Sequence, residues 1–272
     1  MKAALRGAAT GDPRRVDAAL LKGWPLPDPR ASNSKEDRGR VLVIGGSVQI
    51  PGAAILAGIA ALRAGAGKLQ VATARNAALP MAIALPEGKV MGLPSDASGN
   101  IRTLGQEGAE AVRHAGAVLV GPGMDSSEAT RRVVASVLAA ASSTVVLDAG
   151  ALDLAALRGE SRRRSSATLV LTPHAGEMAA LLDTDEDAIA ADAARIAREC
   201  AQVWGVVLAL KGPTTHIAAP DGRMWINTAG SVGLGTSGSG DVLAGLIAGL
   251  AARGATPEQA AVWGVHLHAK AG

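Results

Sequence analysis

The sequence predicts an α/β protein with a mainly parallel central sheet and helices on both faces. Short aliphatic runs alternate along the chain with longer Ala-rich segments of helical period. This alternation is typical of repeated strand–helix–strand units, in which each helix crosses over the sheet. The chain has 272 residues, and no linker-like stretch interrupts residues 34–272. We therefore expect one domain over 34–272, preceded by an N-terminal arm over 1–33.

Each expected strand is a short apolar run that ends in small or polar residues. The strands are expected at 40–44, 68–73, 117–120, 144–148, 168–172 and 206–210. Helical patterns cover 53–66, 130–141, 177–182 and 187–204. A hairpin follows at 215–218 and 223–226 about the turn Pro220-Asp221-Gly222, and helices at 241–253 and 257–269 complete the chain. The arm contains a short helix at 16–22 before three prolines.

Composition narrows the range of partners. The chain has 27 basic and 24 acidic residues, and a net charge of +3 does not predict a nucleic-acid surface. Phe and Tyr are absent, so stacking platforms for single-stranded nucleic acid lack their side chains. The arginine run from Arg162 to Arg164 is interpreted as a solvated loop. The single cysteine, Cys200, is expected to be a small buried apolar group.

No apolar run is long enough to span a bilayer, and the first 30 residues lack the apolar stretch of a signal peptide. We therefore expect a cytoplasmic protein that binds neither membrane nor nucleic acid.

Small, polar and charged residues follow five of the expected strands. The segments are Gly45-Gly46-Ser47, Gly121-Pro122-Gly123, Asp148-Ala149-Gly150, residues 172–177 and residues 211–215. In an open parallel sheet, ligands bind beyond the carboxyl ends of the strands. Together these segments predict a binding site at that edge. His174 and Lys211 are candidates within it, although a turn histidine and a surface lysine are equally consistent with their positions.

A Gly-rich segment leads into the first C-terminal helix. Its glycines leave backbone N–H groups free to converge, and the helix adds its positive end, so Gly238, Ser239 and Gly240 predict an anion hole for phosphate. Asp241 follows, and its carboxylate either caps the helix or takes a proton from a hydroxyl that attacks the phosphate. The spacing Gly233-x-Gly235-x-x-Gly238 matches a dinucleotide fingerprint, but no further strand follows to complete such a fold.

The sequence predicts no protein-ligated metal site. His266 and His268 are two residues apart on a helical pattern, so their side chains point in different directions. A magnesium ion that arrives with nucleotide phosphates would leave no such ligand pattern.

The order of these motifs resembles that of a known family, the ADP-dependent NAD(P)H-hydrate dehydratases, a branch of the ribokinase-like superfamily. The motifs are Gly45-Gly46-Ser47, Pro51-Gly52-Ala53-Ala54, Gly65-Ala66-Gly67, Gly121-Pro122-Gly123, Leu147-Asp148-Ala149, Leu171-Thr172-Pro173-His174-x-Gly176-Glu177, Leu210-Lys211-Gly212 and Gly238-Ser239-Gly240-Asp241-Val242-Leu243-Ala244-Gly245. The similarity covers about 38–272. It implies a ribokinase-like three-layer sandwich and a stand-alone form of the dehydratase domain of the bifunctional repair enzyme.

The resemblance also implies a reaction and the residues that perform it. Hydrated NADH or NADPH, in the 6S form, would be phosphorylated on its C6 hydroxyl by ADP, and loss of phosphate would restore the dihydronicotinamide. Asp241 would be the base. The hydrated nucleotide would contact Ala53, Gly123, His174 and Asp241. The adenine nucleotide would contact Lys211, Gly212, Pro213, Thr214, Thr215 and Gly240.

The family further implies Mg²⁺ with ADP, a homo-oligomer with a tetramer as the expected form, and functional pairing with a separate NAD(P)H-hydrate epimerase. The chain departs from the common pattern before the anion hole, where Gly230-Ser231-Val232-Gly233 replaces Gly-Asn-Pro-Gly and Gly235-Thr236-Ser237-Gly238 replaces Ala-Thr-Gly-Gly.

Two alternatives stay open. One is a small-alcohol kinase of the same superfamily, although such vitamin-precursor kinases usually carry Asn where His174 stands. The other is a nucleotide-binding protein without turnover.

Overall fold

The computed structural model describes residues 11–28, 30 and 34–272. The strands are β1 (Arg14–Arg15), β2 (Arg40–Ile44), β3 (Lys68–Ala74), β4 (Gly88–Leu93), β5 (Ala117–Val120), β6 (Thr144–Leu147), β7 (Leu169–Leu171), β8 (Val207–Leu210), β9 (Thr215–Ala218) and β10 (Met224–Asn227). The α-helices are α1 (Ala18–Gly23), α2 (Pro51–Arg63), α3 (Arg75–Ala84), α4 (Gly105–Arg113), α5 (Glu128–Ala140), α6 (Leu154–Arg158), α7 (Glu160–Arg164), α8 (Ala175–Leu182), α9 (Glu186–Ala191), α10 (Ala193–Trp204), α11 (Ser239–Ala252) and α12 (Pro257–Ala271). Short 3-10 turns lie at Ala149–Ala151 (η2) and Val232–Leu234 (η3).

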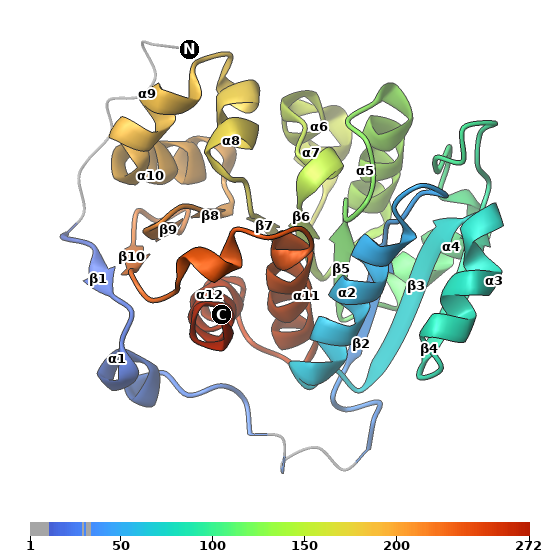
Figure 1. Ribbon diagram of the computed structural model, residues 1–272, viewed down its shortest axis with the longest axis horizontal. Coiled ribbons are helices and arrows are strands. Elements are labelled where there is room, and N and C mark those ends of the chain that lie inside the picture. Colours follow the sequence, from blue (N-terminus) through green and yellow to red (C-terminus); the bar gives the residue numbers. More distant parts are fainter. Residues whose placement is uncertain (1–10, 29, 31–33) are drawn as a thin grey trace.

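The described strands form one sheet in the order β1-β10-β9-β8-β7-β6-β5-β2-β3-β4 (Figure 1). Pairing is parallel from β8 through β4, whereas β9 is antiparallel to both β8 and β10. The carboxyl ends of β6, β7 and β8 therefore meet at one edge of the sheet, as the sequence predicts.

Helices cover both faces of the sheet (Figure 1), because the strands bury both of their sides. Alternate strand residues enter two separate cores: Leu42 and Val118 pack with α4, α5, α8 and α10, whereas Val43 and Leu119 pack with α2, α11 and α12. Two helical layers around a parallel sheet confirm the predicted three-layer α/β architecture. Among the described residues, no helix is both long and apolar enough to cross a membrane.

The expected strands are confirmed to within two residues, but sequence patterns missed an edge of the sheet. The segment between β3 and β5 contains α3, β4 and α4, for which no element was predicted. Strand β4 lies at the sheet edge and contains two glycines, so only one of its sides shows an apolar pattern. No pattern predicted the short β1, because it consists of two exposed arginines that pair only with β10.

Two local predictions differ from the structure. The single helix expected over 187–204 is wrong, because the chain leaves helical geometry at Asp192 and forms α9 and α10. The arginine run is exposed at Arg163 and Arg164, but it ends helix α7 and is not a loop. Arg162 donates hydrogen bonds to the carbonyl oxygens of Ala167 and Gly205 at 3.0 Å each. Cys200 is buried, which confirms the prediction for it.

The described part of the arm lies against the domain. β1 pairs in parallel with β10, and the rings of Trp24 and Trp225 stack with centroids 5.7 Å apart. The side chain of Gln259 on α12 donates hydrogen bonds to the backbone oxygens of Trp24 and Pro25. The arm boundary expected at residue 33 lies outside the described residues and stays a prediction.

Helices α2 and α11 approach so closely that their backbones touch. A Cβ atom added to Gly245 would lie 2.2 Å from the carbonyl oxygen of Ala57, and one added to Gly249 would lie 2.4 Å from that of Ala61. Glycine is therefore required at both positions of α11. The contact places the N-terminus of α11 beside the start of α2, at the carboxyl edge of the sheet (Figure 1).

Gly245→Ala is expected to lower the free energy of unfolding by about 1–3 kcal/mol, because the added methyl group forces two helix backbones apart. Gly52→Ala is the matched control, because a Cβ at Gly52 of α2 would have no heavy atom within 4 Å. Urea unfolding followed by circular dichroism measures both variants. Equal loss of stability in the two variants would contradict this account of the α2–α11 contact.

Candidate functional site

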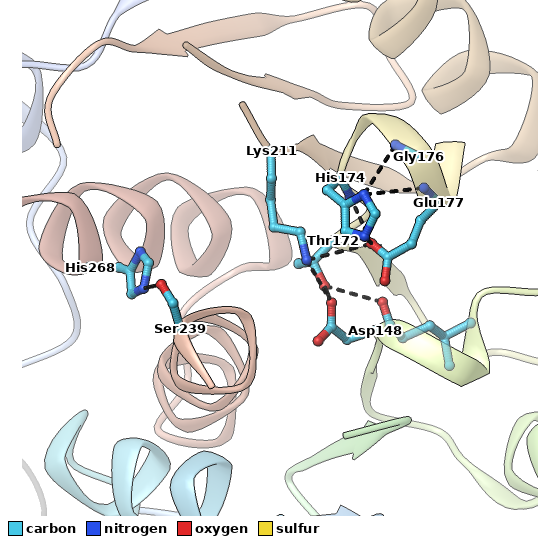
Figure 2. A network of polar contacts seen from close by, with 9 residues as sticks. Asp148, Thr172, His174, Gly176, Glu177, Lys211, Ser239 and His268 are labelled. Atoms are coloured by element: carbon cyan, nitrogen blue, oxygen red, sulfur yellow. Dashed lines mark hydrogen bonds and ion pairs between the residues drawn. The ribbon is translucent and has the colours of Figure 1, made fainter. Parts of the chain in front are cut away.

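Three neighbouring strands each deliver a polar side chain to one place (Figure 2). Asp148 follows β6, Thr172 follows β7 and Lys211 follows β8. The hydroxyl of Thr172 donates to Oδ1 of Asp148 at 2.7 Å, and Nζ of Lys211 donates to the same oxygen at 3.2 Å. Nζ also lies 3.7 Å from Oε2 of Glu177 on α8. The ammonium group is therefore held between two carboxylates.

His174 begins helix α8 and closes a reciprocal cap. Its Nδ1 accepts hydrogen bonds from the backbone N–H groups of Gly176 and Glu177, at 3.1 and 3.3 Å. The carboxylate of Glu177 accepts in return from the backbone N–H of His174 at 2.8 Å. Because Nδ1 accepts, a neutral ring carries its proton on Nε2. His174 therefore presents an N–H donor at Nε2, which lies 3.6 Å from Oε2 of Glu177, and its side chain is 57% exposed.

Asp241 lies in the first turn of α11 and is not its cap. Gly238 takes the cap position, in the left-handed conformation with φ +85°, and no side chain bonds to the cap. The capping interpretation of Asp241 is therefore wrong. Among the residues that the structure describes, none forms a hydrogen bond with the Asp241 carboxylate. Burial, and then the like charge of Asp148, raises the pKa of Asp241 to about 6, whereas Lys211 acts in the opposite direction.

The predicted anion hole is formed in part by amides that already have a partner. The N–H of Ser239 donates to the carbonyl oxygen of Thr236 at 3.2 Å. The hydroxyl of Ser239 lies 3.1 Å from Nε2 of His268 on α12 (Figure 2). A Cβ atom added to Gly240 would lie 3.4 Å from Nζ of Lys211. The first turn of α11 and the Lys211 ammonium thus face the same space, which suits an anion.

A cavity of about 890 Å³ opens in front of this turn. Its walls include His174, Ser239 and His268. Residues 229–232 and 234–236, which belong to one loop, also line it. Of the residues predicted to bind the adenine nucleotide, those that line it are Lys211, Gly212, Pro213, Thr215 and Gly240, whereas Thr214 is not among them. A pocket of this size accommodates a nucleotide-sized ligand.

Ala53 and Gly123 lie together in a separate place, outside the lining of that cavity. A Cβ atom added to Gly123 would lie 3.1 Å from Cβ of Ala53 and 2.4 Å from the carbonyl oxygen of Ile50. Gly123 has φ +67°, so both its conformation and its surroundings require glycine. A Cβ atom on Gly238 would in turn lie 2.5 Å from Cδ1 of Leu56 on α2. The start of α11 therefore lies beside the helix that carries Ala53.

The two C-terminal histidines contact different elements. Nδ1 of His266 lies 3.4 Å from Oδ1 of Asn227, whereas His268 contacts Ser239. Within the described ranges, no group of three or more His, Cys, Asp or Glu side chains is arranged to hold a metal ion.

Sequence reasoning assigned no role to Asp148, Thr172, Glu177 or His268. Asp148, Thr172 and Glu177 belong to the polar segments that follow the strands. Such segments indicate the position of a site, but they do not indicate which side chains contact one another. His268 had no signal, because its contact with Ser239 spans two helices.

The comparisons with known proteins place these features in a family. Residues 41–272 match a family model described as NAD(P)H-hydrate dehydratase. The chain belongs to this family. It is 50% identical over 260 residues to the ADP-dependent (S)-NAD(P)H-hydrate dehydratase of Xanthomonas campestris pv. campestris, covering 95% of this chain and 87% of that relative.

Solved structures agree with this assignment. The ADP/ATP-dependent NAD(P)H-hydrate dehydratase from Bacillus subtilis, co-crystallised with ATP/Mg²⁺, superposes with a TM-score of 0.81 at 30% identity, covering 96% of this chain and 89% of that one. A ribokinase-like superfamily protein from Enterococcus faecalis V583 gives a TM-score of 0.74 at 28% identity, with 94% and 86% covered. The predicted ribokinase-like fold is confirmed.

His174→Ala is expected to lower the free energy of unfolding by about 1 kcal/mol, because it removes the acceptor of the α8 cap. His174→Asn keeps a short side-chain acceptor at the same position and should stay close to wild type. Chemical denaturation compares the three proteins. A loss of equal size in both variants would show that the cap is not what His174 contributes to stability.

Asp241→Asn is expected to stabilise the fold in a pH-dependent way. The folded pKa of about 6 exceeds the usual aspartate pKa of 3.8, so the ionised form is disfavoured in the folded protein. The stability of the wild type relative to the Asn variant is therefore fully present below pH 3.8 and is lost as pH rises through about 6. Unfolding free energies measured from pH 4 to pH 8 test this, and a pH-independent difference would contradict it.

Proposed function

We propose that this protein repairs damaged nicotinamide nucleotides by ADP-dependent dehydration of (6S)-NADHX and (6S)-NADPHX, which yields NADH or NADPH, AMP and phosphate. One observation carries the proposal: Asp241, a carboxylate without a hydrogen-bond partner among the described residues, lies in the first turn of α11, directly after the cavity-lining residues Ser239 and Gly240, and the charges of Asp148 and Lys211 act on its pKa. Family membership supports the same reaction.

The chemistry follows from the leaving group. Hydroxide leaves carbon poorly, so the C6 hydroxyl is first converted into a phosphate ester. Asp241 takes the hydroxyl proton as the oxygen attacks the β-phosphorus of ADP, and AMP departs. A carboxyl group whose pKa is about 6 is ionised at pH 7 and is still basic enough to accept that proton. The ester then loses phosphate with help from the ring nitrogen, and loss of a C5 proton restores the dihydronicotinamide.

The cavity side of the site suits the nucleotide. Lys211 and the first turn of α11 stabilise charge on the transferred phosphoryl group, and preorganised donors of this kind contribute about 3–4 kcal/mol each in other enzymes. Gly212, Pro213 and Thr215 extend this wall towards the rest of ADP, and we propose that Thr214 contacts ADP from outside the lining. Outside the cavity lining, the small residues Ala53 and Gly123 admit the hydrated nucleotide, and His174, in the cavity wall, donates a hydrogen bond to it through Nε2.

A magnesium ion accompanies ADP in this proposal. Glu177 supplies a hard carboxylate oxygen of the kind that Mg²⁺ prefers, and its side chain is 22% exposed and lies 3.7 Å from Nζ of the cavity-lining Lys211. These features fit an ion that binds mainly through nucleotide phosphates and water. When bound, it would neutralise part of the phosphate charge.

Further parts of the proposal concern the cellular setting. Specificity for the 6S form requires a separate NAD(P)H-hydrate epimerase, because the 6R form would otherwise stay unrepaired. We also propose a cytoplasmic location, where the hydrated nucleotides and ADP occur together, and a homo-oligomer, with a tetramer as the expected form.

The direct test supplies acid-hydrated NADH, Mg²⁺ and either ADP or ATP, and follows the absorbance of the dihydronicotinamide. Recovery with ADP in step with AMP and phosphate release supports the proposal. Recovery with ATP alone keeps the reaction and reverses the choice of donor. No recovery with either donor, together with transfer from ATP to a small alcohol, would replace the dehydratase with the kinase.

Asp241→Asn is expected to lower kcat by about 10²–10⁴-fold, because it removes the general base. ADP should still bind, which isothermal titration calorimetry measures. In the wild type, kcat/KM should fall as pH drops below about 6, where Asp241 becomes protonated. A variant that retains wild-type turnover would exclude Asp241 as the base.

A further inference from the structure

Asp148 is a buried charge for which the proposed reaction has no use. Its side chain is 3% exposed, and its Oδ1 receives hydrogen bonds from both Thr172 and Lys211 (Figure 2). Carboxylates are rarely buried unless a cation and further donors compensate for the lost water. Here both are present, and the cation is the one that faces the first turn of α11.

The position of Lys211 explains why a carboxylate is needed. Nζ lies 3.4 Å from where a Cβ atom of Gly240 would be, next to the positive N-terminal end of α11. A lysine side chain has a flexible four-carbon stem, and a cation beside a helix N-terminus is repelled. Without an anion behind it, the ammonium would swing away from the helix. Asp148 supplies this anion at 3.2 Å, closer than Glu177 at 3.7 Å.

Asp148 itself is fixed from two directions. The Thr172 hydroxyl, on a fully buried residue, donates to it at 2.7 Å. Its backbone N–H donates to Val120 at 3.1 Å, and its carbonyl oxygen would lie 1.7 Å from a Cβ atom on Gly121. Gly121, with φ +123°, thus allows the loop after β5 to close against Asp148. The carboxylate is a rigid anchor.

We propose that Asp148 is a positioning residue, which holds the Lys211 ammonium against the first turn of α11, where the transferred phosphoryl group is received. This inference rests on the proposed function and adds to it a residue that never touches either substrate. Thr172 orients the Asp148 carboxylate, and Asp148 influences the transferred phosphoryl group only through the position of the Lys211 ammonium.

The charge of Asp148 also acts on the base. After burial, it is the second cause of the raised pKa of Asp241, Glu177 adds to the rise, and Lys211 opposes it. Helix α2 carries no charged side chain before Arg63 at its far end, and on α12 burial lowers the pKa of His268, which disfavours a positive charge on that ring. Removal of the Asp148 charge should therefore lower the pKa of Asp241, because the effect of Asp148 is larger than the opposite effect of Lys211, which weakens when the ammonium moves away.

The test compares Asp148→Asn, which preserves shape but removes charge, with Thr172→Val, which preserves the charge and removes one hydrogen bond. For Asp148→Asn we expect kcat to fall about 100-fold, as misplacement of a catalytic group by about 1 Å does elsewhere. The Kd for ADP should change much less than kcat, because the displaced Lys211 weakens its contact with the phosphates while the loss of a negative charge beside them offsets part of that effect. The acid limb of the pH profile, where kcat/KM falls as Asp241 becomes protonated, should move to a pH below 6. Thr172→Val should lower kcat less and leave the acid limb in place.

A second measurement reads the position of Lys211 without using turnover. The folded proteins are treated briefly with a small amine-reactive reagent, and modification of each lysine is measured by mass spectrometry. Lys211 is 18% exposed in the wild type, whereas Lys89 is 62% exposed and serves as the internal standard. Relative to Lys89, modification of Lys211 should rise several-fold in Asp148→Asn and less in Thr172→Val.

Unchanged modification of Lys211 in both variants would overturn the proposal, and so would a wild-type kcat and acid limb in Asp148→Asn. Loss of ADP affinity in parallel with kcat would also overturn it, because that result indicates general damage to the site. If the wild type restores no dihydronicotinamide, the proposed function fails, while the labelling still decides whether Asp148 positions Lys211. If Asp148→Asn does not fold, the Thr172→Val labelling decides.

Discussion

The backbone contact between α2 and α11 fixes the place where the chemistry is proposed to occur. Gly245 and Gly249 leave no side chain between the two helices, so α11 cannot slide along α2 without a clash. The N-terminus of α11 is therefore held at the carboxyl edge of the sheet, where β6, β7 and β8 end. A helix end is a useful anion site only if its position is fixed, because its field weakens within about one turn.

Around that helix end, charge is arranged so that one carboxylate stays reactive. Asp148 and Glu177 share the Lys211 ammonium, whereas Asp241 has no hydrogen-bond partner among the described residues and is about half buried. The two engaged carboxylates and the loss of water together raise the pKa of Asp241, which is what a base that works near neutral pH needs. Asp148 and Glu177, which hold the Lys211 ammonium, thus also raise the basicity of the Asp241 carboxylate.

The departures from the common family pattern lie in the loop that covers the cavity and not in the first turn of α11. Ser231 begins the short η3 turn, with its hydroxyl oxygen accepting from the N–H of Gly233 and its O–H directed to the carbonyl oxygen of Gly272. Val232, at the tip, is fully exposed. The loop therefore forms a defined turn with its altered sequence, and the glycine that begins α11, Gly238, is retained.

The sequence alone determined most strands, most helices and the edge of the sheet that carries the site. These features follow from local periodicity and from the residues that end each strand, which a chain reveals position by position. Strand β4 escaped because two of its six residues are glycines, which hide the apolar pattern, and β1 escaped because it consists of two exposed arginines. Only the tertiary structure decided that Asp148 meets Lys211, 63 residues away, that His174 presents Nε2, and that Asp241 has a raised pKa. Contacts between distant residues and the loss of water around a charge arise only when the layers pack together.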